Sequence, residues 1–123
     1  MPKKIMIVDD EEDMRIYLQT IFRKAGYDTD IAVNGEEALQ NISFIKPDLI
    51  TLDILMPQKS GLNFFEMIRN TKTNKRIPII VVSGVSGHSE FFSNNKDSDI
   101  TAYLEKPIKP DELVAKAKKL LGD

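Results

Sequence analysis

The chain of 123 residues contains no cysteine and only one histidine, His88. Without cysteine it can form neither a disulfide framework nor a zinc–thiolate or thiolate-based site. It also lacks an apolar run close to the roughly 20 residues that span a bilayer, and its start, Met-Pro-Lys-Lys, is unlike a secretory signal peptide. We therefore expect a cytoplasmic protein without membrane contact, and we assign His88 no catalytic role.

The sequence also lacks a strong excess of either charge. Its formal net charge is −2, with 29% charged and 41% hydrophobic residues. This composition is ordinary for a globular protein and gives no electrostatic reason to expect nucleic-acid binding. The length suits one hydrophobic core, and there are neither repeats nor low-complexity tracts. We therefore expect a single domain over residues 1–123.

Five apolar segments alternate with segments of helical periodicity. The apolar segments lie at about 4–8, 29–33, 48–52, 77–82 and 100–104. The first, third and fourth are nearly continuous in aliphatic residues, as strands buried on both faces are, whereas the second and fifth suit edge strands. Five βα units with right-handed crossovers predict an α/β fold in which a doubly wound parallel sheet lies between two helical layers.

Several residues mark the expected helix ends. Asn34 with Glu37 resembles a capping box, Gly26 suits a left-handed helix end, and Pro110 suits a first helical position. The helix expected within 86–99 is the weakest, because Ser, Asn and Asp compete with helical hydrogen bonding. We expect that helix to be short or frayed.

Charged side chains follow three of the predicted strands at the points where those strands end. Asp9 and Asp10 follow the first strand, Asp53 the third and Lys106 the fifth. The carboxyl ends of parallel strands share one edge of the sheet, where α/β proteins place their sites. Three carboxylates gathered there repel one another unless a cation joins them, and Mg²⁺ is a cation that prefers oxygen ligands. An aspartate beside a metal ion and a lysine suits phosphoryl transfer to a carboxylate.

At these spacings the chain resembles the receiver domain of two-component response regulators, including the stand-alone chemotaxis type. The matching residues are Asp9-Asp10, Asp53 in Asp-Ile-Leu-Met-Pro, Gly61 eight residues later, Ser83-Gly84 and Lys106-Pro107. The resemblance covers essentially the whole chain, and the five pieces in this order are highly specific. It implies a flavodoxin-like three-layer (βα)5 sandwich with five parallel strands in the order 2-1-3-4-5.

The resemblance implies a role for each matching residue. Asp53 would accept the phosphoryl group. Mg²⁺ would be bound directly by Asp10 and Asp53 and by the main-chain carbonyl of Leu55, and through water by Asp9. Taken alone, Asp9 and Asp10 could simply begin a helix, but this interpretation loses weight once Asp53 and Lys106 are considered with them.

Further residues would bind the phosphoryl group or respond to it. Ser83 and Lys106 would each contact one of its oxygens, and the Lys106-Pro107 peptide bond is expected to be cis. Tyr103 matches the aromatic residue whose rotamer couples to phosphorylation, although an aromatic on an edge strand often only covers core. Serine after a strand is also common in turns, which gives Ser83 an alternative, purely structural interpretation.

The function implied by the resemblance is that of a signalling module. The chain would accept a phosphoryl group from a sensor histidine kinase, a phosphotransfer protein or a small acyl phosphate, catalysing only its own phosphorylation and dephosphorylation. It would then change its affinity for an unidentified partner protein, as a monomer or as a phosphorylation-linked dimer. The chain could also be the receiver part of a longer regulator with an output domain.

Two rival functions are less well supported. A small aspartyl-phosphate hydrolase of the haloacid-dehalogenase type would need a second aspartate where this chain has Leu55. A flavodoxin-like flavin binder would need a Ser/Thr/Gly loop after the first strand, where five consecutive acids (9–13) stand instead.

Two positions that flank the expected site concern the lifetime of the phosphoaspartate. Leu55 and Val85 are apolar and cannot orient an attacking water molecule, so we expect a comparatively long-lived phosphoaspartate.

Overall fold

The computed structural model describes residues 2–54, 60–71, 76–84 and 100–123. The strands are β1 (Lys4–Val8), β2 (Asp28–Ala32), β3 (Leu49–Asp53), β4 (Ile79–Ser83) and β5 (Thr101–Glu105). The helices are α1 (Glu12–Lys24), α2 (Gly35–Ile45), α3 (Ser60–Asn70) and α5 (Pro110–Leu121). Each predicted strand overlaps an observed one, while the helix predicted within 86–99 lies outside the described residues.

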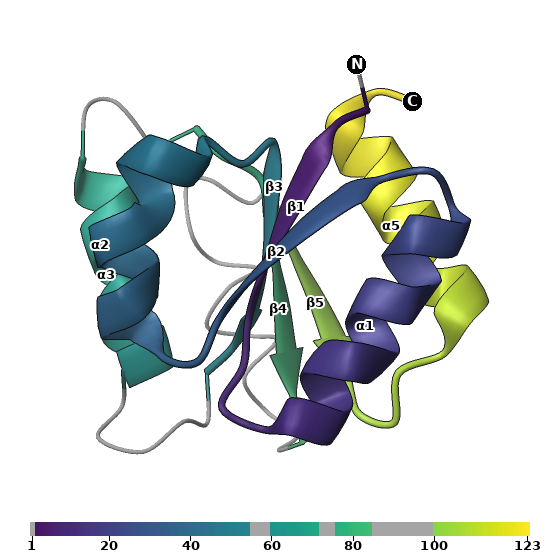
Figure 1. The fold of residues 1–123 in the computed structure, drawn as a ribbon, viewed down its shortest axis with the longest axis horizontal. Coiled ribbons are helices and arrows are strands. Elements are labelled where there is room, and N and C mark those ends of the chain that lie inside the picture. The colour runs from purple at the N-terminus through teal and green to yellow at the C-terminus, as the bar shows by residue number, and fades with distance from the viewer. Residues whose placement is uncertain (1, 55–59, 72–75, 85–99) are drawn as a thin grey trace.

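The five strands form one parallel sheet in the order β2-β1-β3-β4-β5, which confirms the order expected from the resemblance. The two edge strands are β2 and β5, the two whose sequences are more polar. Helices α2 and α3 cover one face of the sheet, and α1 and α5 cover the other (Figure 1). The fold is therefore the predicted three-layer α/β sandwich.

Buried side chains form one cluster on each face of the sheet. On one face Ile42 of α2 and Phe64 of α3 pack against the strands. On the other face Phe22 of α1 and Leu113 of α5 do the same. All residues of β3 and β4 are buried, and each fully buried large apolar side chain contributes roughly 1.5–3 kcal/mol. This double-sided packing holds the strand ends in place.

The predicted helix ends follow from local hydrogen bonding and backbone conformation. The side-chain oxygen of Asn34 accepts a hydrogen bond from the backbone N–H of Glu37 (2.8 Å), while the carboxylate of Glu37 accepts one from the backbone N–H of Val33 (3.2 Å). Gly26 has a φ of +97°, and Pro110 begins α5. These local sequence signals are thus present at the ends of α1, α2 and α5.

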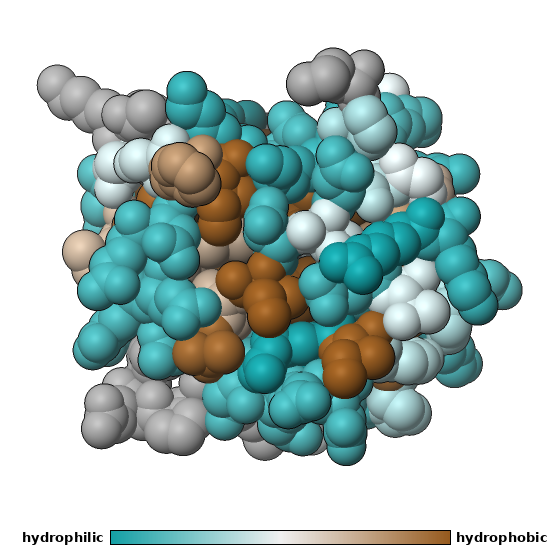
Figure 2. Space-filling view, in the orientation of Figure 1, coloured by the Kyte–Doolittle hydropathy of each residue, from teal (hydrophilic) through white to brown (hydrophobic). Residues whose placement is uncertain are grey.

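The exposed apolar side chains are distributed over several elements. Phe44 of α2 is 90% exposed, and Met67 of α3 is also exposed. In Figure 2 the hydrophobic side chains of the viewed face lie in separate places among hydrophilic ones. Single exposed apolar residues are common on protein surfaces and need no special explanation. Among the described helices, none combines the length and the apolar character that crossing a membrane requires.

Candidate functional site

The sheet brings the predicted site residues to one edge. The backbone N–H of Lys106 donates to the carbonyl oxygen of Ser83 (2.8 Å), and that of Asp9 donates to the carbonyl oxygen of Ala32 (3.1 Å). These bonds continue the strand pairing one residue beyond β5 and β1. Asp53 is the last residue of β3. Parallel pairing therefore makes all three charged positions leave the sheet at its carboxyl edge.

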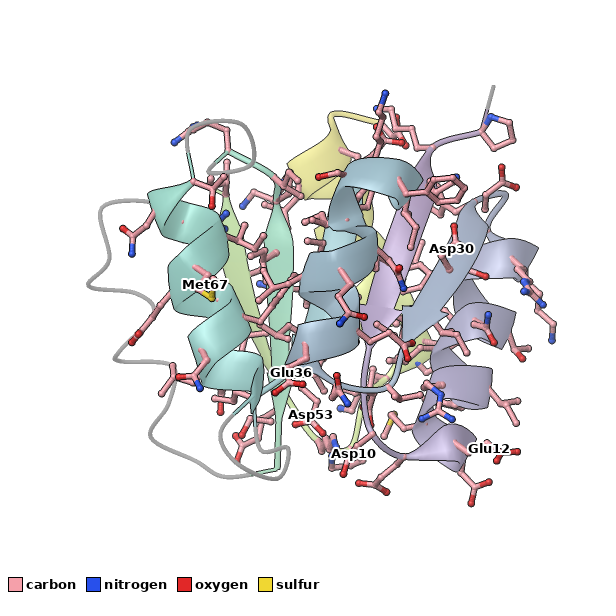
Figure 3. All side chains as sticks on the ribbon, turned by 60° about the vertical axis from the view of Figure 1, so that its left-hand side comes forward. Asp10, Glu12, Asp30, Glu36, Asp53 and Met67 are labelled. Atoms are coloured by element: carbon pink, nitrogen blue, oxygen red, sulfur yellow. The ribbon has the colours of Figure 1, made fainter. Side chains whose placement is uncertain are left out.

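Four carboxylates gather at this edge. Asp9, Asp10, Glu11 and Asp53 each offer an oxygen, and these oxygens lie within 4.8 Å of one another. Figure 3 shows Asp10 and Asp53 near each other at this edge of the sheet. Asp9 and Asp53 are buried, being 1% and 3% exposed, whereas Asp10 and Glu11 are exposed. The cluster therefore has a buried floor and a solvent-facing rim.

Asp9 shows that this cluster suits a cation. Its Oδ1 accepts a hydrogen bond from the backbone N–H of Glu11 (2.9 Å), but its buried Oδ2 has no hydrogen-bond partner among the described residues. Burial raises the pKa of Asp9 to about 6, and the nearby carboxylates of Asp53 and Asp10 act in the same direction. The backbone N–H of Glu11 and the ammonium of Lys106 oppose this rise in pKa. An unpaired buried carboxylate oxygen is costly, and a hard divalent ion with oxygen ligands would satisfy it.

Lys106 supplies an ammonium group to this site. Its Nζ lies 3.5 Å from Oδ2 of Asp53 and 3.9 Å from Oε1 of Glu11. The lysine side chain is 22% exposed, so it contacts the floor of the cluster while remaining open to solvent. The peptide bond between Lys106 and Pro107 is cis, as expected from the resemblance. One ammonium thus faces carboxylates at both the floor and the rim.

The requirement for glycine at position 61, eight residues after Asp53, has a steric cause. A Cβ atom on Gly61 would lie 2.3 Å from the carbonyl oxygen of Asp53 and 2.8 Å from Cα of Ile54. The start of α3 therefore packs directly against the end of β3, at a distance that only glycine allows. At Gly84, in contrast, an added Cβ would lie 3.9 Å from Cδ of Lys106, which is an ordinary contact.

The remaining predicted residues are placed as follows. Ser83 is fully buried at the end of β4, next to Lys106 through their shared backbone hydrogen bond. Tyr103 is half-buried on β5 and packs against the core cluster on the α2–α3 face. Its role as a switch stays a prediction, as does the division between direct and water-mediated cation ligands. Leu55, with its predicted carbonyl ligand, lies outside the described residues.

Sequence reasoning gave Glu11 no role, although the structure brings its carboxylate into the cluster. A signal was present, because Glu11 directly follows the acid pair and precedes the first residue of α1. A side chain at that point can turn back toward the strand ends. Acidity alone could not have identified it, since Glu12 and Asp13 follow at once and neither belongs to the cluster.

Comparison with known proteins decides the family. Residues 5–118 match the model that describes the response regulator receiver domain. The chain belongs to that family. Receiver domains typically bind Mg²⁺ at an acidic pocket, and this chain has a cluster of acidic residues at the carboxyl edge of its sheet.

Individual relatives support the same assignment. The alkaline phosphatase synthesis transcriptional regulatory protein PhoP of Bacillus subtilis is 36% identical over 123 residues, covering 98% of this chain and 49% of PhoP. The chemotaxis protein CheY of Thermotoga maritima is 32% identical over 115 residues, covering 93% of each protein. The chain thus spans about half the length of PhoP but nearly all of CheY.

A solved structure relates the fold to a metal-bound state. The response regulator protein TrrA of Thermotoga maritima, crystallised in complex with Mg²⁺ and BeF, is 38% identical to this chain. The match covers 97% of this chain and 99% of TrrA, with a TM-score of 0.80. A receiver domain with this fold therefore accommodates Mg²⁺ together with a fluoride complex of beryllium.

Proposed function

We propose that this chain is a phosphorylation-controlled signalling module with Asp53 as its phosphoacceptor. The observation that carries the proposal is the position of the Asp53 carboxylate. It lies 3.5 Å from the ammonium of Lys106 and within 4.8 Å of three further carboxylates that could hold a divalent ion. A buried nucleophile beside a lysine and a cation site suits phosphoryl transfer.

The proposed reaction transfers one phosphoryl group. A carboxylate oxygen of Asp53 forms a bond to phosphorus while the bond from phosphorus to the donor's nitrogen or acyl oxygen breaks, and the leaving group departs with that electron pair. The negative charge is spread over three phosphoryl oxygens. Lys106 would pair with one of them, and the Ser83 hydroxyl would donate a hydrogen bond to another. When bound, Mg²⁺ would supply positive charge that offsets the remaining charge.

The proposed output is a change in affinity for a partner protein. The phosphoryl group would stabilise one arrangement of the loops and of Tyr103, and its effect is limited by its differential affinity for the two arrangements. The donor would be a sensor histidine kinase or a phosphotransfer protein. The chain would catalyse only its own phosphorylation and dephosphorylation, without turnover of a separate substrate, and the expected cytoplasmic location remains part of the proposal.

Two arrangements of the whole protein fit this proposal. The chain covers 93% of the chemotaxis protein CheY, and one arrangement is a stand-alone module that acts on a separate protein. It covers 49% of PhoP, and the other arrangement is the receiver part of a longer regulator. In either arrangement the site chemistry is the same, so one experiment on the chain tests it.

The test is the intact mass after incubation with acetyl phosphate and Mg²⁺. We expect one added phosphoryl group, absent in Asp53→Asn and absent when a chelator removes the cation. Asp111→Asn is the matched control, because Asp111 is an exposed acid in the first turn of α5, and it should be phosphorylated like the wild-type chain. A folded wild-type chain that gains no mass and binds no beryllofluoride would contradict the proposal, and steady release of phosphate from a phosphomonoester would favour the hydrolase instead.

A further inference from the structure

Glu11 stands at the start of α1, but its side chain does not cap the helix. It is the N-cap residue of α1, with φ −95° and ψ 121°, and its side chain makes no capping hydrogen bond. N-cap side chains usually accept a hydrogen bond from the first helical turn, which explains the preference there for Ser, Thr, Asp and Asn. The carboxylate of Glu11 instead lies 3.9 Å from Nζ of Lys106. Its side chain is directed to the site rather than to its own helix.

The negative charge of Glu11 lies on the solvent-exposed side of the carboxylate cluster. Its carboxylate belongs to the cluster within 4.8 Å, together with the carboxylate of Asp53. Glu11 is 65% exposed in its side chain, whereas Asp53 is 3% exposed. A donor that reaches Asp53 from solvent therefore comes close to the Glu11 carboxylate. A cation held among these acids would also lie near the Glu11 carboxylate.

We propose that Glu11 is a specificity-determining residue whose carboxylate strengthens cation binding and slows reaction with anionic phosphodonors. This inference rests on the proposed function of Asp53. Coulomb's law gives the same charge opposite effects on the two ligands, since it attracts Mg²⁺ and repels a dianion such as acetyl phosphate. Glu11 also competes with the transferred phosphoryl group for Lys106, because the ammonium faces Glu11 and Asp53 at once.

The neighbouring Glu12 serves as a control that distinguishes a purely structural role of Glu11 from the proposed role in the site. Glu12 is also exposed and acidic and lies in the first turn of α1. Figure 3 shows it on α1, apart from Asp10 and Asp53, and it does not belong to the carboxylate cluster. A general effect of negative charge at a helix N-terminus would be shared by both glutamates. An effect of the site would be confined to Glu11.

The first measurement is a calorimetric titration of the phosphate-free chain with Mg²⁺. A unit charge about 5 Å from a doubly charged ion in water-like surroundings changes binding roughly 15-fold without salt, and screening at ordinary ionic strength reduces this to roughly threefold to tenfold. We therefore expect Glu11→Gln to weaken Mg²⁺ binding by about that factor and Glu12→Gln to change it less than about twofold. Thermal unfolding of both variants checks that neither exposed substitution disturbs the fold.

The second measurement is the rate of phosphorylation by acetyl phosphate, with Mg²⁺ saturating for each variant. Glu11→Gln should react about three to ten times faster than the wild-type chain, and the gain should shrink as added salt screens the charge. Phosphoramidate, which carries less negative charge, should show a smaller gain. Glu12→Gln should match the wild type with both donors.

The outcomes separate this inference from the proposed function. Unchanged Mg²⁺ affinity and unchanged rates in Glu11→Gln, or equal changes in Glu12→Gln, would overturn the role of Glu11 while leaving Asp53 as acceptor. If no chain takes up a phosphoryl group, the proposed function fails. In that case a loss of Mg²⁺ affinity confined to Glu11→Gln still supports Glu11 as part of the cation site.

Discussion

Removal of the charge on Asp9 should stabilise the metal-free protein. Burial is the main reason that the pKa of Asp9 rises from 3.8 to about 6, and each pKa unit corresponds to about 1.4 kcal/mol. The charged carboxylate therefore costs about 3 kcal/mol at neutral pH. Asparagine keeps an oxygen for the backbone N–H of Glu11, but its amide nitrogen would be buried without a partner, at a cost of about 1–3 kcal/mol. The expected net gain of Asp9→Asn is therefore about 0–2 kcal/mol.

The sign of this effect depends on pH. Because the pKa of Asp9 is raised in the folded state, the folded chain binds more protons than the unfolded chain between about pH 4 and pH 6. The contribution of Asp9 to stability is fully present below about pH 4 and is lost as pH rises through about 6. The advantage of Asp9→Asn should therefore be greatest at pH 7 and absent or reversed at pH 4, where only the cost of the buried amide remains.

Urea unfolding followed by circular dichroism measures the free energy of unfolding. Wild type and Asp9→Asn are compared at pH 4 and pH 7 with a chelator present, and again at pH 7 with Mg²⁺. Because Mg²⁺ binds the folded cluster, it should stabilise the wild-type chain more than the variant. An Asp9→Asn chain that is less stable than wild type at pH 7 without metal, or a difference independent of pH, would refute the reasoning.

Three further predictions concern single contacts. Gly61→Ala should lower the free energy of unfolding by about 1–3 kcal/mol because its Cβ would meet the preceding strand at 2.3 Å, whereas Gly84→Ala should change it little; equal effects in urea unfolding would contradict this. The pKa of Tyr27 is raised to about 12, first by burial and then by its hydrogen bond to Asp123, so its contribution to stability is present below pH 10 and is lost as pH rises toward 12. An absorbance titration should show the late ionisation of Tyr27, and this late step should be missing in Tyr27→Phe. Leu55→Asn should speed phosphate loss from the phosphoaspartate by giving a water molecule a polar partner, and unchanged decay would rule that out.

The convergence of the charged residues could be predicted because it depends only on strand direction. Asp9, Asp53 and Lys106 each follow an apolar run, and parallel strands bring such positions to one edge whatever the details of packing. The polar composition of β2 and β5 likewise predicted their places at the edges of the sheet. The order of the strands between them came from the family resemblance and not from the pattern of residues.

Contacts between distant segments could not be predicted in the same way. Arg69 of α3 donates hydrogen bonds to the carbonyl oxygen of Ile77 (2.7 Å) and to the hydroxyl of Thr101 (2.8 Å), and its guanidinium lies 5.3 Å from the centre of the Phe65 ring. Helical periodicity places an arginine on a face of a helix but does not indicate which strands meet it. The steric reason for Gly61 depends in the same way on the packing of α3 against β3.

The charge balance of the site links its stability to its proposed chemistry. Among the described residues, four carboxylates gather beside the ammonium of Lys106. Their mutual repulsion favours binding of a divalent cation, and a phosphoryl group on Asp53 would add further negative charge. The cation and the phosphoryl group should therefore bind cooperatively. Thermodynamic linkage requires this coupling to be reciprocal, so the factor by which Mg²⁺ favours a phosphoryl analogue is also the factor by which the analogue tightens Mg²⁺. Burial of the Asp9 carboxylate is thus costly in the metal-free folded chain, and the same concentration of negative charge makes the proposed switch depend on metal.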